Sequence, residues 1–346
     1  SNGRLRSIED LGETKTFHWF VSNPINNYGV NINIGDYIEF SEVYKGEKGD
    51  LDMIYYVLRD NILRAKSQFK DAVKMMQAFE YWFGPYPFYE DSFKIVEVPY
   101  LGMEHQSSIT YGNKYMKGYL GRDLSRTGWG LKFDYIIIHE AGHEWFANNI
   151  TYKDIADMWI HESFTTYSEN LYLDYHYGKE AASEYVIGTR TSISNRSPII
   201  GKYGVNFRGS DLYSKGANIL HTLRQITRDD EKWRSILRGL NKEFYHQTVT
   251  TAQIENYISN KMKYDLSTFF NQYLRDFRIP TLEYFYEDGN LNCRWINVVD
   301  NFKMPVELIV DDKKVFIEID SSYKKIPSIS DTLKIDKDYY VFLKKI

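Results

Sequence analysis

The chain has 346 residues, of which 43% are hydrophobic and 26% are charged, an ordinary globular composition with room for two or three domains. Its formal net charge of −4 and the lack of any long basic run argue against nucleic-acid binding. No apolar run approaches the roughly 18 residues that a membrane-spanning helix needs, so we expect no membrane span.

The single cysteine, Cys293, leaves no pair for a disulfide within the chain. It lies in the segment NLNCRWINV, where we expect a small apolar side chain within a strand. The chain opens with SNGRLRS, which lacks the features of a signal peptide, and we expect the natural amino terminus to lie upstream. Both the cytoplasm and the cell envelope therefore remain open as compartments.

The first third of the chain mixes strand and helix patterns. Residues 15–43 combine β-branched and aromatic residues with Asn-Pro and Asn-Tyr-Gly turns, which predicts strands. A charged break with two glycines follows at 45–50. Apolar residues then recur at helical spacing from 52 to 82, which predicts a helix, and SFKIVEV at 92–98 predicts a strand.

The middle of the chain is almost wholly helical in pattern. An apolar period of 3.6 residues recurs near 132–149, 161–176, 179–194, 211–227, 230–245, 251–262 and 265–276. After residue 280 the period changes to two, in VELIV and VFIEI. We therefore predict an α+β fold with a β-rich segment at 1–44, a mainly helical domain with a small mixed sheet at 45–280, and a small β-sandwich-like domain at 281–346.

The stretch HEAGH begins at His139 and predicts a metal site. His139 and His143 are four residues apart, so on a helix both imidazoles leave the same face and can share one ion. Glu140 is turned about 100° around the helix and falls beside that ion, where a general base should lie. The alternative is a charged helix face at the edge of a core, because YIIIHE just upstream is strongly apolar.

A third metal ligand is expected on the next predicted helix. Glu162 follows His143 after 18 intervening residues, and two histidines with one glutamate form a known catalytic zinc set. His161 is the rival ligand. Adjacent helical residues point about 100° apart, so His161 and Glu162 should not bind the same ion. We favour Glu162.

One zinc ion per chain in such a site predicts amide hydrolysis. The ion lowers the pKa of its bound water to about 7 and polarises a carbonyl group. Glu140 is expected to take the proton of this zinc-activated water and to deliver it later to the leaving amine.

The chain resembles zinc aminopeptidases of the aminopeptidase N family, gluzincin metallopeptidases that also include the leukotriene hydrolases. Four stretches in the family's order carry the resemblance, LGMEHQS (101–107), HEAGHEWFANNIT (139–151), DMWIHESFTTYSE (157–169) and DLYSKGANILHTLR (211–224). The resemblance implies a thermolysin-like catalytic domain that holds zinc through His139, His143 and Glu162. It also implies that Glu104 anchors the free amino terminus of a peptide substrate and that Tyr213 stabilises the oxyanion.

Four departures from the family pattern matter. The Asn that usually follows the amine-binding Glu is His105, and the Asn before the third ligand is His161. We expect the ligands to be unaffected, but substrate preference and pH optimum to change. Glu144 stands where many members carry Gln. In length, the resemblance implies that residues 1–44 are only the end of an amino-terminal β domain, and that a helical carboxy-terminal domain is absent.

Three functions follow from these patterns. The leading prediction is a zinc aminopeptidase that removes amino-terminal residues from peptides. The second is a zinc endopeptidase that uses the same centre on internal bonds. The third is a zinc-binding but inactive module that interacts with peptides.

Overall fold

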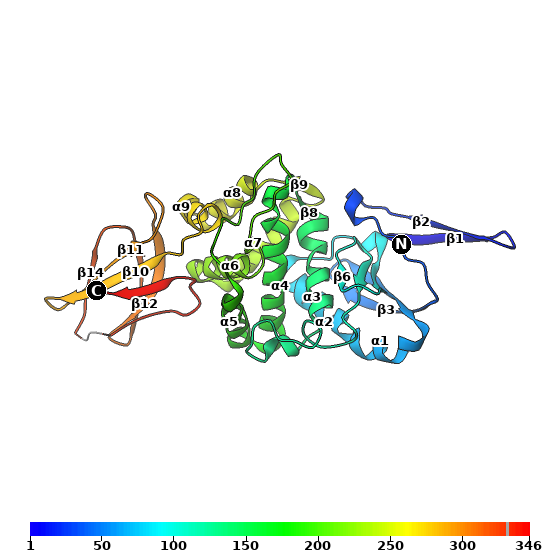
Figure 1. Cartoon of the computed structure of the whole chain (residues 1–346), viewed down its shortest axis with the longest axis horizontal. Coiled ribbons are helices and arrows are strands. Elements are labelled where there is room, and N and C mark those ends of the chain that lie inside the picture. The colour runs from blue at the N-terminus through cyan, green and yellow to red at the C-terminus, as the bar shows by residue number, and fades with distance from the viewer. Residues whose placement is uncertain (330–331) are drawn as a thin grey trace. The chain divides into compact units, whose positions relative to one another are not determined.

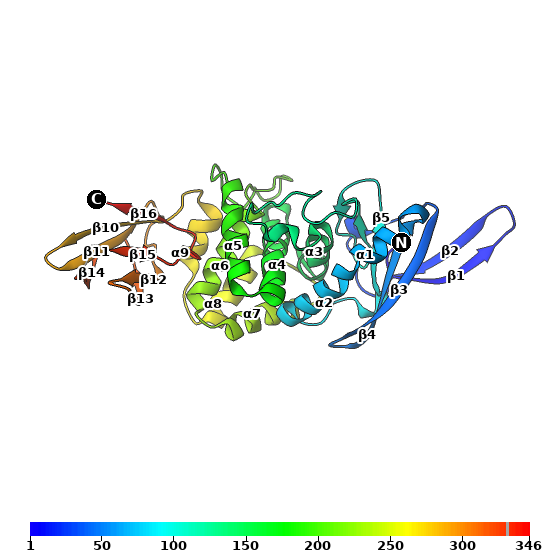
Figure 2. The same ribbon diagram turned by 90° about the horizontal axis from the view of Figure 1, so that it is seen from below.

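The computed structural model describes residues 1–329 and 332–346, and the chain divides into two compact units. The first unit comprises Ser1–Thr151, Ile160–Gly188 and Leu237–Val249. The second comprises Tyr152–Trp159, Thr189–Ile236 and Thr250–Ile346. Figures 1 and 2 label the helices and strands of both units.

The first unit contains a mixed five-stranded sheet in the order β3-β4-β5-β7-β6. Its strands are β3 (Tyr37–Gly46), β4 (Gly49–Leu58), β5 (Phe93–Glu97), β6 (Gly102–Met103) and β7 (Ile109–Tyr111). β4, β5 and β7 run parallel, whereas β3 and β6 are antiparallel edge strands. The unit also has a separate, largely exposed hairpin of β1 (Arg4–Asp10) and β2 (Lys15–Phe20).

The predicted helix at 52–82 is wrong in its first part, because residues 49–58 form β4. Leu51, Met53, Tyr55 and Val57 are all buried and alternate with more exposed neighbours, which is the period of a strand. Apolar residues at the intervening positions hid that alternation. The strand predicted at 92–98 is confirmed by β5, and strands within 15–43 are confirmed only at the two ends, in β2 and β3.

Five helices lie wholly or largely in the first unit, and they pack against its sheet or contribute residues to the site. They are α1 (Ile62–Gln68), α2 (Lys70–Phe83), α3 (Tyr135–Gly142), α4 (Trp159–Tyr177), which enters the unit at Ile160, and α5 (Lys179–Gly188). Figures 1 and 2 show α3 beside α4, and α3 also packs against α2, β6 and β7. Asp134 caps α3 by accepting hydrogen bonds from the N–H groups of Ile136 and Ile137.

The helix predicted at 132–149 ends earlier than expected. Regular α-helix stops at Gly142, and Phe146 has non-helical dihedral angles (φ −124°, ψ 75°). The departure turns the carbonyl oxygen of Phe146 to within 3.1 Å of the His143 Nδ1 atom. The chain after His143 therefore leaves the expected helix, and its Phe146 carbonyl oxygen forms a hydrogen bond with His143.

The second unit combines helices with two small sheets. Its helices are α6 (Ser214–Thr227), α8 (Thr251–Met262) and α9 (Ser267–Phe270), and α7 (Asp230–Glu243) starts in it and enters the first unit at Leu237. One sheet has the order β14-β11-β10-β16 and the other β13-β12-β15. The strands of these two sheets are β10 (Thr281–Glu287), β11 (Asn290–Ile296), β12 (Met304–Val310), β13 (Lys313–Ile319), β14 (Lys324–Pro327), β15 (Leu333–Ile335) and β16 (Phe342–Lys345). The strands β8 (Ile150–Tyr152) and β9 (Gln247–Val249) pair with each other and, except for Tyr152, belong to the first unit.

The predicted α+β fold is confirmed, because each of the two units combines helices with sheets. Cys293 is buried in β11, and burial raises the pKa of its thiol to about 11, as befits a small apolar side chain in a strand. Among the described residues, no helix is both long and apolar enough to cross a membrane.

Candidate metal centre

Two helices of the first unit bring the three predicted ligands together. His139 and His143 project from α3 and the residue that ends it, and Glu162 projects from α4. The Oε2 atom of Glu162 lies 3.6 Å from His139 Nε2 and 3.5 Å from His143 Nε2. One ligand atom from each residue falls within 4.8 Å of the others, and all three side chains are buried. The rival ligand His161 belongs to neither group of possible metal ligands among the described residues.

His139 is fixed through its other ring nitrogen by a carboxylate that sequence analysis missed. Its Nδ1 atom lies 2.8 Å from Glu169 Oε1, and the Tyr185 hydroxyl donates to Glu169 Oε2 at 2.6 Å. The Tyr135 ring stacks on the imidazole at 5.2 Å. With Nδ1–H donating to Glu169, the Nε2 lone pair is left for a metal, which is the usual arrangement of a ligating histidine.

His143 is oriented by the chain that follows it. Its Nδ1 atom lies 3.1 Å from the Phe146 carbonyl oxygen, which can only accept, so the nitrogen carries the proton. The Thr165 hydroxyl lies 3.1 Å from the same nitrogen and 3.4 Å from the same carbonyl oxygen. Nε2 of His143 is therefore also free to bind a metal, and it faces Glu162.

The chemistry of this donor set fits a zinc ion. Glu162 Oε2 is buried and, among the described residues, has no hydrogen-bond partner. Burial alone would raise the pKa of Glu162, but in the metal-free protein the close approach of His139 and the charges of both histidines lower it to about 2. An ionised carboxylate and two oriented Nε2 atoms form the His-His-Glu set that zinc takes in hydrolytic enzymes.

Glu140 lies beside the ligands against strand β6. A methyl group added to Gly102 would come within 3.0 Å of Glu140 Oε1 and 2.7 Å of the Ile136 side chain. Burial raises the pKa of Glu140 to about 8 in the metal-free protein, with the nearby carboxylates Glu104 and Glu162 adding to the effect. A divalent cation at the three ligands would lower it again, because an opposite charge favours the ionised form.

Glu104 lies close to the same centre. One carboxylate oxygen each of Glu104 and Glu140 and one ring nitrogen of His143 fall within 4.8 Å of one another. The segment that follows α3 also contacts Glu104, because Asn148 Nδ2 donates to the Glu104 carbonyl oxygen at 3.0 Å. Ser107 N–H likewise donates to Glu144 Oε1 at 2.7 Å. The predicted amine-binding carboxylate is thus within a few ångströms of the predicted base.

The two imidazoles that depart from the family pattern are both shifted toward the neutral form. Burial, helped by the charge of His143, lowers the pKa of His161 to about 3. Burial also lowers the pKa of His105, against the effect of a hydrogen bond to the Gly29 backbone and of the Glu104 charge. Their influence on pH optimum and substrate preference stays a prediction.

Tyr213 belongs to the second unit. It directly precedes α6, whose first residue is Ser214, and 40% of its surface is exposed. Its predicted role at the oxyanion stays a prediction.

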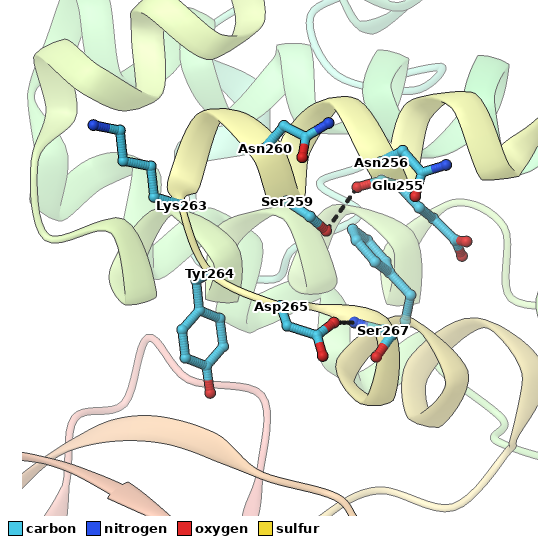
Figure 3. Close-up of a pocket in the computed structure, with 9 residues that line it drawn as sticks. Glu255, Asn256, Ser259, Asn260, Lys263, Tyr264, Asp265 and Ser267 are labelled. Atoms are coloured by element: carbon cyan, nitrogen blue, oxygen red, sulfur yellow. Dashed lines mark hydrogen bonds between the residues drawn. The ribbon is translucent and has the colours of Figure 1, made fainter.

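A polar pocket of about 440 Å³ lies on the second unit, along α8 and the start of α9 (Figure 3). Two of its labelled side chains form hydrogen bonds to positions nearby in the chain. Ser259 donates to the Glu255 carbonyl oxygen, and Asp265 accepts from the Ser267 N–H. None of its lining residues belongs to the predicted site, and we assign no ligand to it.

The fold and the three ligands are typical of zinc metallopeptidases of the HExxH type. The sequence profile of the Peptidase family M1 domain matches residues 67–273. The chain therefore belongs to peptidase family M1, which confirms the resemblance seen in its motifs.

Several known proteins are similar to this chain. "Probable aminopeptidase 1" of Sulfurisphaera tokodaii is 22% identical over 94% of the chain and 43% of its own length. Aminopeptidase A of Legionella pneumophila, solved with aspartic acid, covers 99% of the chain with 15% identity and a TM-score of 0.79, over 42% of its own length. A mutant M1 zinc metallopeptidase of Deinococcus radiodurans, solved with a Tyr-Ser-Ala substrate, covers 80% of this chain and 60% of its own, with 18% identity and a TM-score of 0.63. The chain spans less than half the length of the first two.

Proposed function

We propose that the protein is a zinc-dependent aminopeptidase that removes amino-terminal residues from peptides. The observation that carries the proposal is the gathering of two carboxylates, Glu104 and Glu140, around a ring nitrogen of His143 next to the ligand set. Glu140 would accept and donate a proton, and Glu104 would bind a positively charged amine. The names of the similar proteins, which include aminopeptidases and a peptide-bound metallopeptidase, support the same class.

His139, His143 and Glu162 would hold one zinc ion per chain. When bound, zinc acts as a Lewis acid that activates water and polarises the scissile carbonyl group. Glu140 then accepts the proton released from the attacking water on its carboxylate, and donates it to the amine that leaves. Its packing against Gly102 and its burial keep that carboxylate in one place during both transfers.

Glu104 supplies the preference for a free amino terminus. An α-amino group has a pKa of about 8, so it is largely cationic at neutral pH. A carboxylate that receives this ammonium group in a partly buried site forms a charge-assisted hydrogen bond, which an acetylated terminus cannot form. Tyr213 would donate its hydroxyl to the developing oxyanion.

The domain boundaries at residues 44 and 280 are part of the same proposal. Residues 1–44 would be the end of an amino-terminal β domain, and residues 281–346 a small β domain after the catalytic one. The two sheets formed by β10 to β16 support the second boundary.

The deciding experiment compares free and N-acetylated aminoacyl anilides as substrates of the complete natural protein loaded with zinc. We expect cleavage of the free compounds and little cleavage of the acetylated ones. Equal cleavage of both would reject the role of Glu104, and cleavage of a long peptide blocked at its amino terminus would favour an endopeptidase. Retained zinc with no cleavage of any of these would favour an inactive peptide-binding module.

A further inference from the structure

The loop that carries Glu104 is held from two sides. On one side are the contacts already described, from Asn148 to the Glu104 carbonyl oxygen and from Ser107 N–H to Glu144. On the other side lies the first segment of the chain, which reaches the loop from about a hundred positions away in sequence. Its contacts converge on residues 106–108, through both backbone and side-chain atoms. We call residues 104–108 the anchor loop.

Asn2 is the centre of the contacts from this first segment. Its side chain is 1% exposed, and its Nδ2 atom donates to the Gln106 carbonyl oxygen at 2.6 Å and to the Gly29 carbonyl oxygen at 2.9 Å. Its Oδ1 atom accepts the N–H of Asn31 at 2.5 Å. One carboxamide thus bonds to three backbone groups, at Gly29, Asn31 and Gln106, and uses both of its donors and its acceptor.

The neighbours of Asn2 repeat this pattern along the anchor loop. Gly3 N–H donates to Ser107 Oγ at 3.1 Å, and Asn31 Nδ2 donates to the Ser108 carbonyl oxygen at 3.2 Å. In the opposite direction, Gln106 Nε2 donates to the Pro24 carbonyl oxygen at 3.0 Å. Three consecutive loop residues are therefore bonded to the first 31 residues of the chain.

A buried lysine holds Asn2 in place from behind. Lys94 is 1% exposed and its Nζ atom donates to the Gly3 carbonyl oxygen at 2.6 Å and to the Asp91 carbonyl oxygen at 2.9 Å. Lys94, a residue of β5, thus fixes Gly3 next to Asp91. Through Gly3 and Asn2, the anchor loop is linked to the sheet.

We propose that Asn2 is a positioning residue for substrate amine binding, because it sets the place of Glu104 through the backbone of Gln106. The inference rests on the proposed function, since it concerns the same amine anchor. Buried carbonyl groups need a donor, so without Asn2 the loop must move until Gln106 and Gly29 find other partners. A small displacement of a group that positions the substrate lowers the activity of an enzyme. A shift of the anchor loop would move Glu104 away from the metal ligands and leave the ligands in place.

The test compares Asn2→Ala with the matched control Asn23→Ala. Asn23 lies in the same first segment, but it bonds to Asp91 and Glu90, which lie outside the anchor loop. We expect Asn2→Ala to raise KM for a free aminoacyl anilide roughly tenfold with kcat changed less than about threefold, because Glu104 binds the ammonium group equally in ground and transition states. Zinc content should stay at the wild-type level, and Asn23→Ala should match wild type in all three quantities.

Two further measurements keep the proposal testable if Asn2→Ala is poorly folded. Asn2→Asp keeps the size and the acceptor toward Asn31 but loses both donors, so it should raise KM in the same way. Hydrogen exchange of the zinc-loaded protein should show faster exchange at residues 104–108 in both Asn2 variants, and unchanged exchange over α3 and α4.

The outcomes separate this inference from the proposed function. If the wild type does not distinguish free from acetylated substrates, the amine anchor itself is wrong. If the wild type distinguishes them but the Asn2 variants keep wild-type KM and wild-type exchange at the anchor loop, Asn2 has no positioning role. An equal rise of KM in Asn23→Ala, or a loss of zinc in the Asn2 variants, would also overturn it by showing a general structural effect.

Discussion

The metal ligands and the anchor loop lie within a few ångströms of each other, yet they are held in place in different ways. The ligands come from two packed helices, and their second ring nitrogens bond to groups close along the chain, such as Phe146, or on the next helix, such as Glu169. The anchor loop lies between β6 and β7 and contains no helix or strand, and its backbone is held by side chains from distant segments, Asn2 and Asn148 among them.

This difference separates two functions of one site. Helix geometry sets the ligand positions, so metal binding should tolerate change elsewhere in the molecule. The amine anchor depends on single carboxamides, of which Asn2 alone bonds to three backbone groups, so its position should be sensitive to single substitutions. The predictions below test whether the two regions can be damaged separately.

The largest effect is expected at the base. Glu140→Gln keeps the shape of the side chain but removes the proton acceptor, so kcat should fall by about 10³-fold, within the range of general base catalysis. Zinc content measured by elemental analysis should stay at the wild-type level, because the ligands are untouched. An active Glu140→Gln variant would show that the base is misassigned.

A smaller and more selective loss is expected at the anchor. Glu104→Ala should lower kcat/KM for free aminoacyl anilides by about 10²-fold, the value of a hydrogen bond to a charged group. Activity on acetylated compounds should not change, so the preference for a free terminus should disappear. Retained preference in this variant would place the amine-binding group elsewhere.

Zinc binding by the ligands on the helices can be weakened without changing a ligand. Glu169→Gln should lower zinc affinity about tenfold, at the low end for a group that orients a ligating histidine, because the amide oxygen can still accept from His139. Competition with a chromogenic chelator measures this affinity. Glu180→Ala, an exposed glutamate on α5, is the matched control and should bind zinc as the wild type does.

The smallest effect on the site is expected at the cap of α3, and it is seen in stability. Burial raises the pKa of Asp134 from 3.8 to about 6, against the hydrogen bonds from Gln68, Tyr111 and Asn113. Because the folded-state pKa lies above the unfolded one, the stability that Asp134 contributes is full below about pH 4 and is lost as the pH rises through about 6.

Asp134→Asn removes this titration, so the wild type should lose about 3 kcal/mol of unfolding free energy relative to the variant between pH 4 and pH 7. Urea unfolding with a metal chelator present measures the difference without interference from the zinc ligands. A difference that does not vary with pH would contradict the raised pKa of Asp134.

The sequence predicted the parts of the site that depend on local spacing. His139 and His143 follow from one helical turn, and the fold class follows from the change of apolar period near residue 280. Glu169 lies seven residues after Glu162, two helical turns along the same face, so its place beside the site could have been inferred from α4 alone.

Other features could not be predicted because they depend on contacts between distant segments. The bond from Asn2 to Gln106 spans 104 positions, and no local pattern encodes which loop a buried carboxamide will meet. The strand at 49–58 was mistaken for a helix because its half-exposed positions, such as Ile54 and Tyr56, are also apolar. Only the alignment with β3 and β5 decides which face of it is buried.

The two contacts of α4 with His139 limit how α4 can vary in length. Glu162 faces one nitrogen of that imidazole and Glu169 the other, so a single helix holds the ring at both ends. Inserting or deleting one residue between the two glutamates would rotate one of them by about 100° away from the ring. In homologues, the interval from Glu162 to Glu169 should therefore be free of insertions and deletions.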